Sequence, residues 1–398
     1  MGTTIPIDQI AGFKKEKTVT KAAWDIQPYV YACVFSSLCI IVGLIWDISW
    51  HMTIGRDGLL SPPHDVIYLG AILSGLFSAY HVLKTTFWGS AIEKRASVKF
   101  WGIFYGSLGS LFCLWGAIAM LTSAPFDNWW HGTYGLDVVI LSPPHALLAM
   151  GVMAIQFGAL VAVLSSSHTT GNINDKMHNW LFVVASGILV ISSFFLFSEY
   201  LNRANSHSAL TYQISAILYP SLLIAIARAT RMRWAATAAA AVYMVILLLM
   251  LWILPLFPAV PRLGPVLNHV DHYQPFNFPL LLVVPAFFID LVFNKPAFKS
   301  PFVRVLIASL LFLLVFFIVQ WYFGGFLLTS PLARSWFFGS YSWYFGADPN
   351  WEYRYSFRPG YETIGFDLVK GLLIAGLLAI FSGLAGYKVG GWMKKIQR

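Results

Sequence analysis

Two stretches of this chain combine one aspartate with two histidines inside an otherwise apolar sequence. They read DISWHMTIGRDGLLSPPH (residues 47–64) and DNWWHGTYGLDVVILSPPH (residues 127–145). A carboxylate with two imidazoles is a ligand set that suits copper, zinc or non-haem iron. The pattern therefore predicts two metal sites, with candidate ligands Asp47, His51 and His64 in the first copy and Asp127, His131 and His145 in the second.

The spacing within each copy predicts how the three side chains converge. Asp47 and His51 are four residues apart, so on a continuing helix they lie on one face. Ser61 and the two prolines after it are typical of a helix start, because serine caps helix N-termini and proline is tolerated in the first turn. We therefore expect His64 in the first turn of the next helix, beside the end of the preceding one.

The repetition favours metal binding over simpler interpretations. A lone histidine at a helix end is usually an ordinary interfacial residue, whereas ionisable groups near hydrocarbon are costly and tend to mark function. The second copy keeps the whole pattern, and Gly55 and Asp57 recur there as Gly135 and Asp137. Two alternatives remain open: a hydrogen-bonded polar cluster between helices, and a proton relay.

The composition indicates a polytopic membrane protein. Of 398 residues, 58% are hydrophobic and only 11% are charged, whereas a soluble domain carries about 25% charged residues. The expected fold is an all-α transmembrane helix bundle. Apolar runs predict about ten spans, at residues 28–46, 64–84, 100–123, 144–166, 178–198, 210–228, 234–254, 278–294, 302–328 and 366–391.

The basic residues predict the orientation of the bundle. Nineteen lysines and arginines fall on one side of these spans and six on the other, which by the positive-inside rule places both termini, including segment 1–27, in the cytoplasm. Both aspartate–histidine stretches then face outward. The net charge of +9 is spread over short loops, so we expect no nucleic-acid partner.

The first stretch resembles a known metal-site segment. DISWHMTIGRDGLLSPPH looks like the C subunit of particulate methane and ammonia monooxygenases, the copper membrane monooxygenases. Their pattern of Asp-x-x-x-His-Met-Thr-x-x-Arg-Asp followed by Pro-x-His is matched with the same spacing. The matching residues are Asp47, His51, Met52, Thr53, Arg56, Asp57, Pro62 and His64.

The resemblance also covers the second stretch and, more weakly, the end of the chain. A second family cluster of Asn, His and His falls on Asp127, His131 and His145, so that Asp127 departs from the expected asparagine. HYQPFNFPLLLVVPAFFIDL, from His272, looks like part of the family's A subunit. This implies a C-like region at 28–166, connecting helices at 167–259, and an A-like region at 260–398 with an outer aromatic loop at 329–365.

The resemblance implies a copper-dependent monooxygenase, or a subunit of one, in the cytoplasmic membrane of a bacterium or archaeon. It would hydroxylate a small apolar substrate with O2, using quinol as the electron donor. The resemblance implies copper at the sites, with zinc or iron as the alternatives, and an oligomeric assembly in the lipid bilayer. Asp47, His51 and His64 would be the catalytic ligands. No outer loop is long enough to replace the family's soluble periplasmic copper subunit, so either a separate partner supplies it or this protein works without it. The alternatives are a non-catalytic metal-binding or transport protein and a structural or assembly subunit.

Several other polar residues are weaker candidates. Glu199, Asn202 and His207 could orient metal ligands, although ordinary loop and capping roles are simpler. His269, Asp271 and His272 form another outer group that could contact a metal or a partner. We expect Asp290 to pair with Lys295, and the remaining histidines considered, His81, His168 and His178, to be interfacial.

Overall fold

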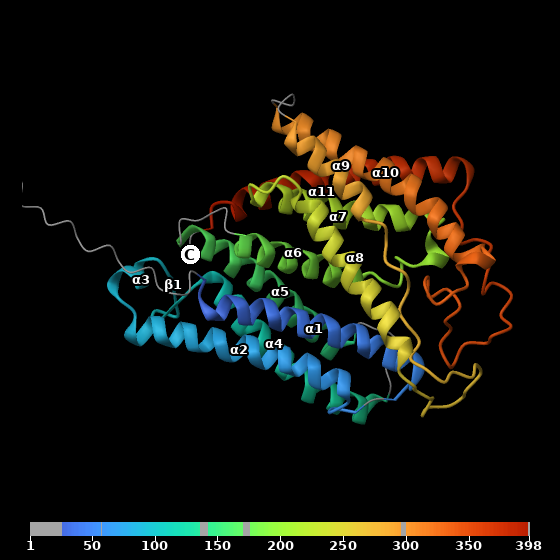
Figure 1. The fold of residues 1–398 in the computed structure, drawn as a ribbon, viewed down its shortest axis with the longest axis horizontal. Helices are drawn as coiled ribbons and strands as arrows, with labels where there is room; N and C mark the ends of the chain where they lie inside the picture. The colour runs from blue at the N-terminus through green and yellow to red at the C-terminus, as the bar shows by residue number, and fades with distance from the viewer. Residues whose placement is uncertain (1–25, 57, 136–141, 170–175, 296–299, 397–398) are drawn as a thin grey trace, which may run out of the picture.

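Long helices lie side by side along one axis of the molecule (Figure 1). The structure is a computed structural model that describes residues 26–56, 58–135, 142–169, 176–295 and 300–396. Within these residues nine helices are long and apolar enough to cross a membrane, which confirms the all-α transmembrane bundle. They are α1 (Pro28–Thr53), α2 (Pro62–Trp88), α4 (Leu108–Tyr134), α5 (Pro143–Thr169), α6 (Lys176–Leu196), α7 (Ala209–Ala229), α8 (Ala235–Ile253), α10 (Pro301–Thr329) and α11 (Gly365–Met393).

The expected span at 278–294 is helical only in its second part. Helix α9 (Val283–Asn294) has 12 residues, which is about 18 Å and too short to cross a hydrocarbon core of about 30 Å. The chain before it runs extended beside α8. Tyr273 N–H donates to the carbonyl of Phe257, beyond the end of α8, and Leu280 N–H donates to the hydroxyl of Tyr243 in its middle.

Helix α9 continues the same path toward the start of α8. The Asp290 carboxylate accepts hydrogen bonds from the main chain of Ala236 (3.3 Å) and Thr237 (2.8 Å), at the first turn of α8. Residues 273–294 thus run the length of α8 as an extended segment and then a helix. The extended part is tolerated because protein groups satisfy its N–H donors. The described residues therefore hold nine helices long enough to cross a membrane, one fewer than the roughly ten spans expected, and residues 273–294 run beside α8 where the remaining span was expected.

The third span differs from its expected position. The sequence predicts a span at 100–123, but α4 begins at Leu108 and continues to Tyr134. The residues before it form the short helix α3 (Ala91–Arg95) and an antiparallel hairpin of β1 (Val98–Phe100) and β2 (Phe104–Gly106). Asp127 and His131 therefore lie within a helix rather than in the loop expected at 124–143.

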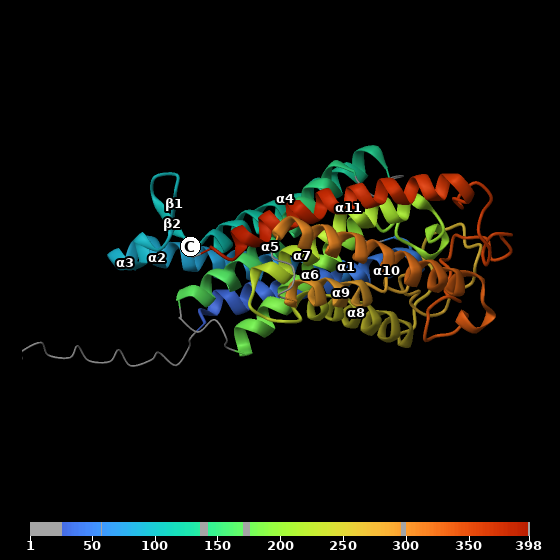
Figure 2. The ribbon, with the colours of Figure 1, turned by 90° about the horizontal axis from the view of Figure 1, so that it is seen from above.

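The bundle has two distinct ends, which Figures 1 and 2 show at opposite ends of the long axis. We call the end with residues 254–282 and 330–364 the cap end. It includes the turns η2 (Arg203–Asn205), η3 (Leu254–Leu256) and η4 (Pro331–Ala333). The opposite end, which we call the basic end, carries α3, the β1–β2 hairpin and the end of α11. Helix α1 also begins there, since the Tyr29 and Ser107 hydroxyls lie 3.0 Å apart.

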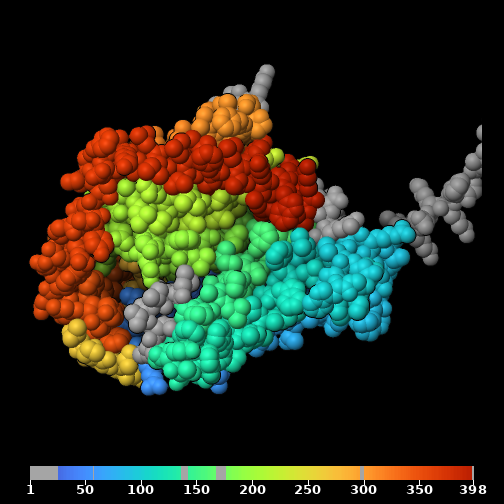
Figure 3. All heavy atoms as spheres, turned by 180° about the vertical axis from the view of Figure 1, so that it is seen from behind, coloured from blue at the N-terminus to red at the C-terminus, as the bar shows by residue number. Residues whose placement is uncertain are grey.

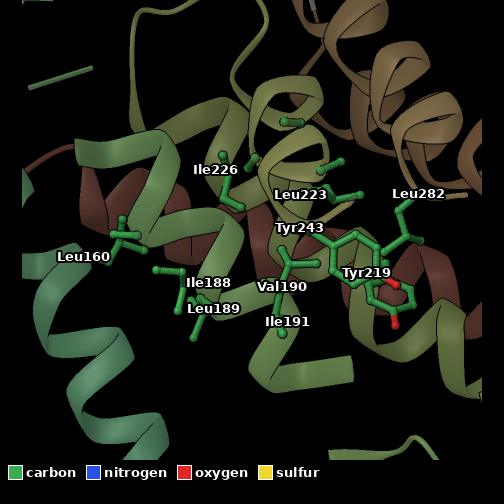
Figure 4. Packing of buried hydrophobic residues seen from close by; sticks show 14 of the residues in the cluster. Leu160, Ile188, Leu189, Val190, Ile191, Tyr219, Leu223, Ile226, Tyr243 and Leu282 are labelled. Atoms are coloured by element: carbon green, nitrogen blue, oxygen red, sulfur yellow. The ribbon is translucent and has the colours of Figure 1, made fainter. Parts of the chain in front are cut away.

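Close helix packing links the two halves of the chain. Figure 3 shows α11 lying over α7, with α4 and α5 beside them. The main core runs through α1 and α5–α11, and Figure 4 shows part of it, including Tyr219, Tyr243 and Leu282. A cavity of about 410 Å³ borders this core near the basic end, and Ser221 is its one lining residue with a polar side chain. This space suits apolar groups.

Candidate metal centre

The first cluster joins the end of α1 to the start of α2. Asp47 and His51 lie one turn apart near the end of α1, and His64 lies in the first turn of α2, as the spacing predicts. The Asp47 carboxylate is 3.8 Å from His51 Nε2 and 3.3 Å from His64 Nε2. The predicted convergence of one carboxylate and two imidazoles is therefore present.

The second cluster repeats this arrangement between α4 and α5. Asp127 Oδ1 lies 3.5 Å from His131 Nε2 and 3.6 Å from His145 Nε2. Close packing of the two helices sets these distances, because small residues face each other along them. A Cβ on Gly116 would lie 2.7 Å from the carbonyl oxygen of Gly151, so larger side chains there would push the helices apart.

Each of the four histidines is fixed through its Nδ1 atom. In three of them the contact is a main-chain carbonyl, and in the fourth it is a hydroxyl. The contacts are His51 to Gly55 O (3.1 Å), His64 to Gly58 O (3.0 Å), His131 to Gly135 O (2.9 Å) and His145 to Ser142 Oγ (3.0 Å). An Nδ1–H donor bound to a carbonyl leaves Nε2 as the ligand atom, which is the usual orientation of metal-binding histidines.

Two glycines make this orientation possible. Gly55 and Gly135 follow the ends of α1 and α4 with φ of +91° and +87°, a region that favours glycine. In each case the chain turns back so that the glycine carbonyl meets the imidazole four residues earlier. The recurrence of this glycine in the sequence thus has a structural reason. Asp57 and Asp137, which also recur, lie outside the described residues.

The donor atoms fit a bound cation. Oδ1 of Asp47 and Oδ1 of Asp127 are buried and have no hydrogen-bond donor, although histidine Nε2 atoms face both. A buried acceptor without a donor costs free energy, and a metal ion would supply the missing interaction. Of the described residues, Asp127, His131 and His145 are the group whose ligand atoms all lie within 4.8 Å of one another. The ligands of the first cluster would need to move closer together.

The cap end holds the first cluster in place. The Gln274 main chain donates to Thr53 Oγ1 (2.8 Å) and accepts from Ser49 Oγ (2.7 Å) at the end of α1. Phe345 N–H donates to the carbonyl of Met52, next to His51. The sequence analysis did not identify these residues, since no local pattern connects positions more than 200 residues apart.

The loop candidates form contacts of their own. His207 Nδ1 lies 3.2 Å from Glu362 Oε1, and its ring stacks between Trp321 and Phe357, so it joins the outer loop to α10. Asn202 caps η2 through the N–H of Asn205. These contacts are separate from both aspartate–histidine clusters.

The second group of candidates also stays apart from the clusters. Asp271 Oδ1 is 2.5 Å from His272 Nδ1, and this hydrogen bond lowers the pKa of the exposed Asp271 carboxyl. Among the described residues, His269 does not form with Asp271 and His272 a group of three side chains close enough to hold one metal ion. This pair remains a local contact in the cap.

The remaining candidates have structural contacts. His81 stacks on Tyr29, and His178 lies 3.4 Å from the Ser166 hydroxyl, while the side chain of His168 is outside the described residues. The expected pairing of Asp290 with Lys295 is wrong. The Asp290 carboxylate instead caps the first turn of α8, where main-chain N–H groups need acceptors.

Searches of protein-family models, curated proteins and solved structures return no match to this chain.

Proposed function

We propose that this chain is a membrane-bound copper-dependent monooxygenase, or a subunit of one, that hydroxylates a small apolar substrate with O2. The observation that supports this most is the repeated cluster of one aspartate and two histidines. Both copies join the end of one helix to the start of the next, and both orient their histidines through Nδ1. The sequence resemblance to the copper membrane monooxygenases selects copper among the metals that suit these ligands.

The chain's own residues would hold and shape the site. The carboxylates of Asp47 and Asp127 offset cationic charge, and the fixed imidazoles present Nε2 with little loss of conformational freedom. Copper, when bound, supplies the redox chemistry that O2 reduction needs. The side chains of the two clusters are 18–48% exposed in this chain, so lipid or a partner subunit would have to limit the access of water and thereby strengthen electrostatic interactions within the site.

The partners in this proposal follow from the reaction. One oxygen atom enters the substrate and the other becomes water, which requires two electrons and two protons, and a membrane quinol can provide both. The substrate would arrive through the bilayer. Following the distribution of basic residues, we place the cap end outside the membrane. A soluble copper subunit could dock there. We also expect an oligomer, as in the family that this chain resembles.

Metal analysis of protein purified from membranes tests the site. We expect about two copper ions per chain, one of them lost in His51→Ala and the other in His131→Ala. The control is His272→Ala, which removes a histidine from the same end of the molecule but from neither cluster. Loss of both ions in either single variant would indicate one shared site instead of two.

Oxygen consumption tests the reaction. The wild-type protein, given a quinol and a small hydrocarbon or ammonia, should consume O2 in a copper-dependent manner and form the oxidised product. His51→Ala should abolish this activity, and His272→Ala should retain it. Metal uptake into sealed vesicles without O2 consumption would contradict the enzyme and favour transport.

A further inference from the structure

Three arginines gather around Tyr355 at the cap end. The guanidinium carbon of Arg334 lies 3.8 Å from the centre of the Tyr355 ring, and that of Arg354 lies 5.1 Å from it. Arg203, from the loop between α6 and α7, is close enough for both Tyr355 and Arg354 to act on its charge. Segments separated by more than 100 residues thus bring three cations together.

No carboxylate neutralises this group within the described part of the chain. The ion pairs there have histidine as their basic partner, and none involves these arginines. Arg354 donates to two neutral main-chain carbonyls, those of Pro349 and Tyr341. The three positive charges therefore lack an anionic partner.

The acidic residues of the cap are engaged elsewhere. Glu352 contacts the Tyr353 hydroxyl, and Glu362 lies 3.2 Å from His207 Nδ1. The Asp348 carboxylate accepts a hydrogen bond from Asn350 N–H (2.8 Å). These three carboxylates of segment 330–364 therefore leave the arginines without an anion, which a ligand could supply.

The charge on Arg203 is poorly solvated. Burial lowers the pKa of Arg203 to about 10, nearby Tyr355 acts in the opposite direction, and Arg354 adds to the lowering. The guanidinium still carries its charge at neutral pH. A partly buried cation beside a second cation is unfavourable without an anion, so a bound anion would stabilise this arrangement.

Exposed apolar side chains at the ends of α10 and α11 indicate where the membrane surface lies relative to the cluster. Leu332, two residues before Arg334, is 80% exposed, and so is Phe366 at the start of α11. Ile364 is 72% exposed. In a transmembrane bundle such side chains face lipid, so the arginines lie where the long helices end and lipid headgroups begin.

We propose that Arg203, Arg334 and Arg354 bind the phosphate group of a phospholipid from the leaflet at the cap end. Guanidinium groups match phosphate oxygens with paired hydrogen bonds, and Tyr355 holds Arg334 in position. The apolar rim favours a lipid headgroup over free phosphate, because the acyl chains would lie against Leu332 and Phe366. This site is separate from both aspartate–histidine clusters and does not depend on the proposed reaction.

The test uses the full-length protein in detergent, with bound lipid measured by native mass spectrometry and stability by thermal unfolding. Three additions are compared: phosphatidylglycerol, diacylglycerol with the same acyl chains but no phosphate, and inorganic phosphate. We expect only phosphatidylglycerol to bind and to raise the Tm. An equal rise with diacylglycerol would overturn the site, and an equal rise with inorganic phosphate at the same concentration would overturn its assignment to lipid.

Arg334→Gln should weaken phosphatidylglycerol binding about tenfold, because it removes a charged hydrogen-bond donor. Arg334→Lys, which keeps the charge but not the paired donors, should have an intermediate effect. The matched control is Arg262→Gln, another exposed arginine at the cap end. An unchanged Tm of the lipid-free protein would confirm that each variant is folded. Equal weakening in Arg334→Gln and Arg262→Gln would mean that lipid binding depends only on the overall positive charge of the cap end, and the proposal would be wrong.

Arg203→Gln separates ligand binding from a purely structural role. Removing a poorly solvated charge should leave the Tm of the lipid-free protein unchanged or higher, while the rise in Tm with phosphatidylglycerol becomes smaller. The opposite result, a lower lipid-free Tm with a full lipid response, would show that Arg203 acts only within the fold and would overturn its part in the site.

Discussion

Asp127 is the candidate ligand at which this chain departs from the family it resembles, which has asparagine there. Its Oδ1 atom is buried without a hydrogen-bond donor and lies 3.5 and 3.6 Å from two imidazoles. We predict that Asp127→Asn weakens divalent metal binding at the second cluster by about tenfold or more, because the anionic charge that attracts the cation is lost. The fold should persist, since the two side chains are nearly isosteric.

A metal titration in the His51→Ala background measures this effect without the first cluster. The control is Asp65→Asn, which makes the same charge change in the first turn of α2 at an exposed position. If Asp127→Asn and Asp65→Asn bind metal equally well, Asp127 is not a ligand, and the second cluster is a structural polar contact.

The helix ends that carry the ligands depend on two glycines in the same backbone conformation but different surroundings. A Cβ on Gly135 would meet no atom of the described residues within 4 Å, whereas one on Gly55 would lie 2.7 Å from Phe345 Cζ and 2.8 Å from Leu263 Cβ. We predict that Gly135→Ala destabilises the protein by about 1–2 kcal/mol through its positive φ. Gly55→Ala should cost more, because a steric clash adds to the strain. Thermal unfolding of both variants measures which substitution destabilises the protein more. Equal losses of stability would contradict the prediction.

Gln274 connects the cap to the end of α1. Its side chain accepts from Trp343 N–H (3.1 Å) and donates to the His272 carbonyl (3.0 Å), and its main chain holds Thr53 and Ser49. We predict that Gln274→Ala destabilises the fold by about 1–3 kcal/mol, because Trp343 loses its acceptor. Metal affinity should fall at the first cluster and stay unchanged at the second.

The control for this variant is Gln213→Ala. Gln213 also donates one side-chain hydrogen bond, to the Gly371 carbonyl (3.2 Å), but between α7 and α11 and away from the clusters. It should leave metal binding at both clusters unchanged. If Gln274→Ala also leaves the first cluster unchanged, the cap stabilises the fold without positioning the ligands.

Local patterns predicted the two aspartate–histidine clusters well, because helix periodicity acts over a few residues. Asp47 and His51 share a face of α1, and α2 begins after Ser61 with His64 in its first turn, as expected, although the Ser61 hydroxyl makes no capping hydrogen bond. The broken crossing was not predictable from periodicity, since residues 278–282 are as apolar as a helix. Their extended form depends on Tyr243 and Gln320, which bind the N–H groups of Leu280 and Leu281.

At the scale of the whole molecule, the path of the chain determines which end of the bundle each segment reaches. Nine crossings are an odd number, so nine long helices alone would place the start of α1 and the end of α11 at opposite ends of the bundle. Both lie at the basic end (Figure 1), which agrees with a tenth crossing by residues 273–294. The excess of lysine and arginine then favours a cytoplasmic basic end and an outward cap end with both aspartate–histidine clusters.

Cysteine labelling from each side of the membrane tests this path and its orientation together. The single substitutions are Leu60→Cys and Leu267→Cys at the cap end, and Ile92→Cys and Phe302→Cys at the basic end, all at exposed positions. The background is Cys39→Ser, because Cys33 and Cys113 are buried and Cys39 is partly exposed. We predict that a membrane-impermeant reagent labels the first two variants in intact cells and the other two only after permeabilisation. Labelling of Leu267→Cys and Phe302→Cys from the same side would exclude the tenth crossing, and complete reversal of the pattern would exclude the outward orientation of the clusters.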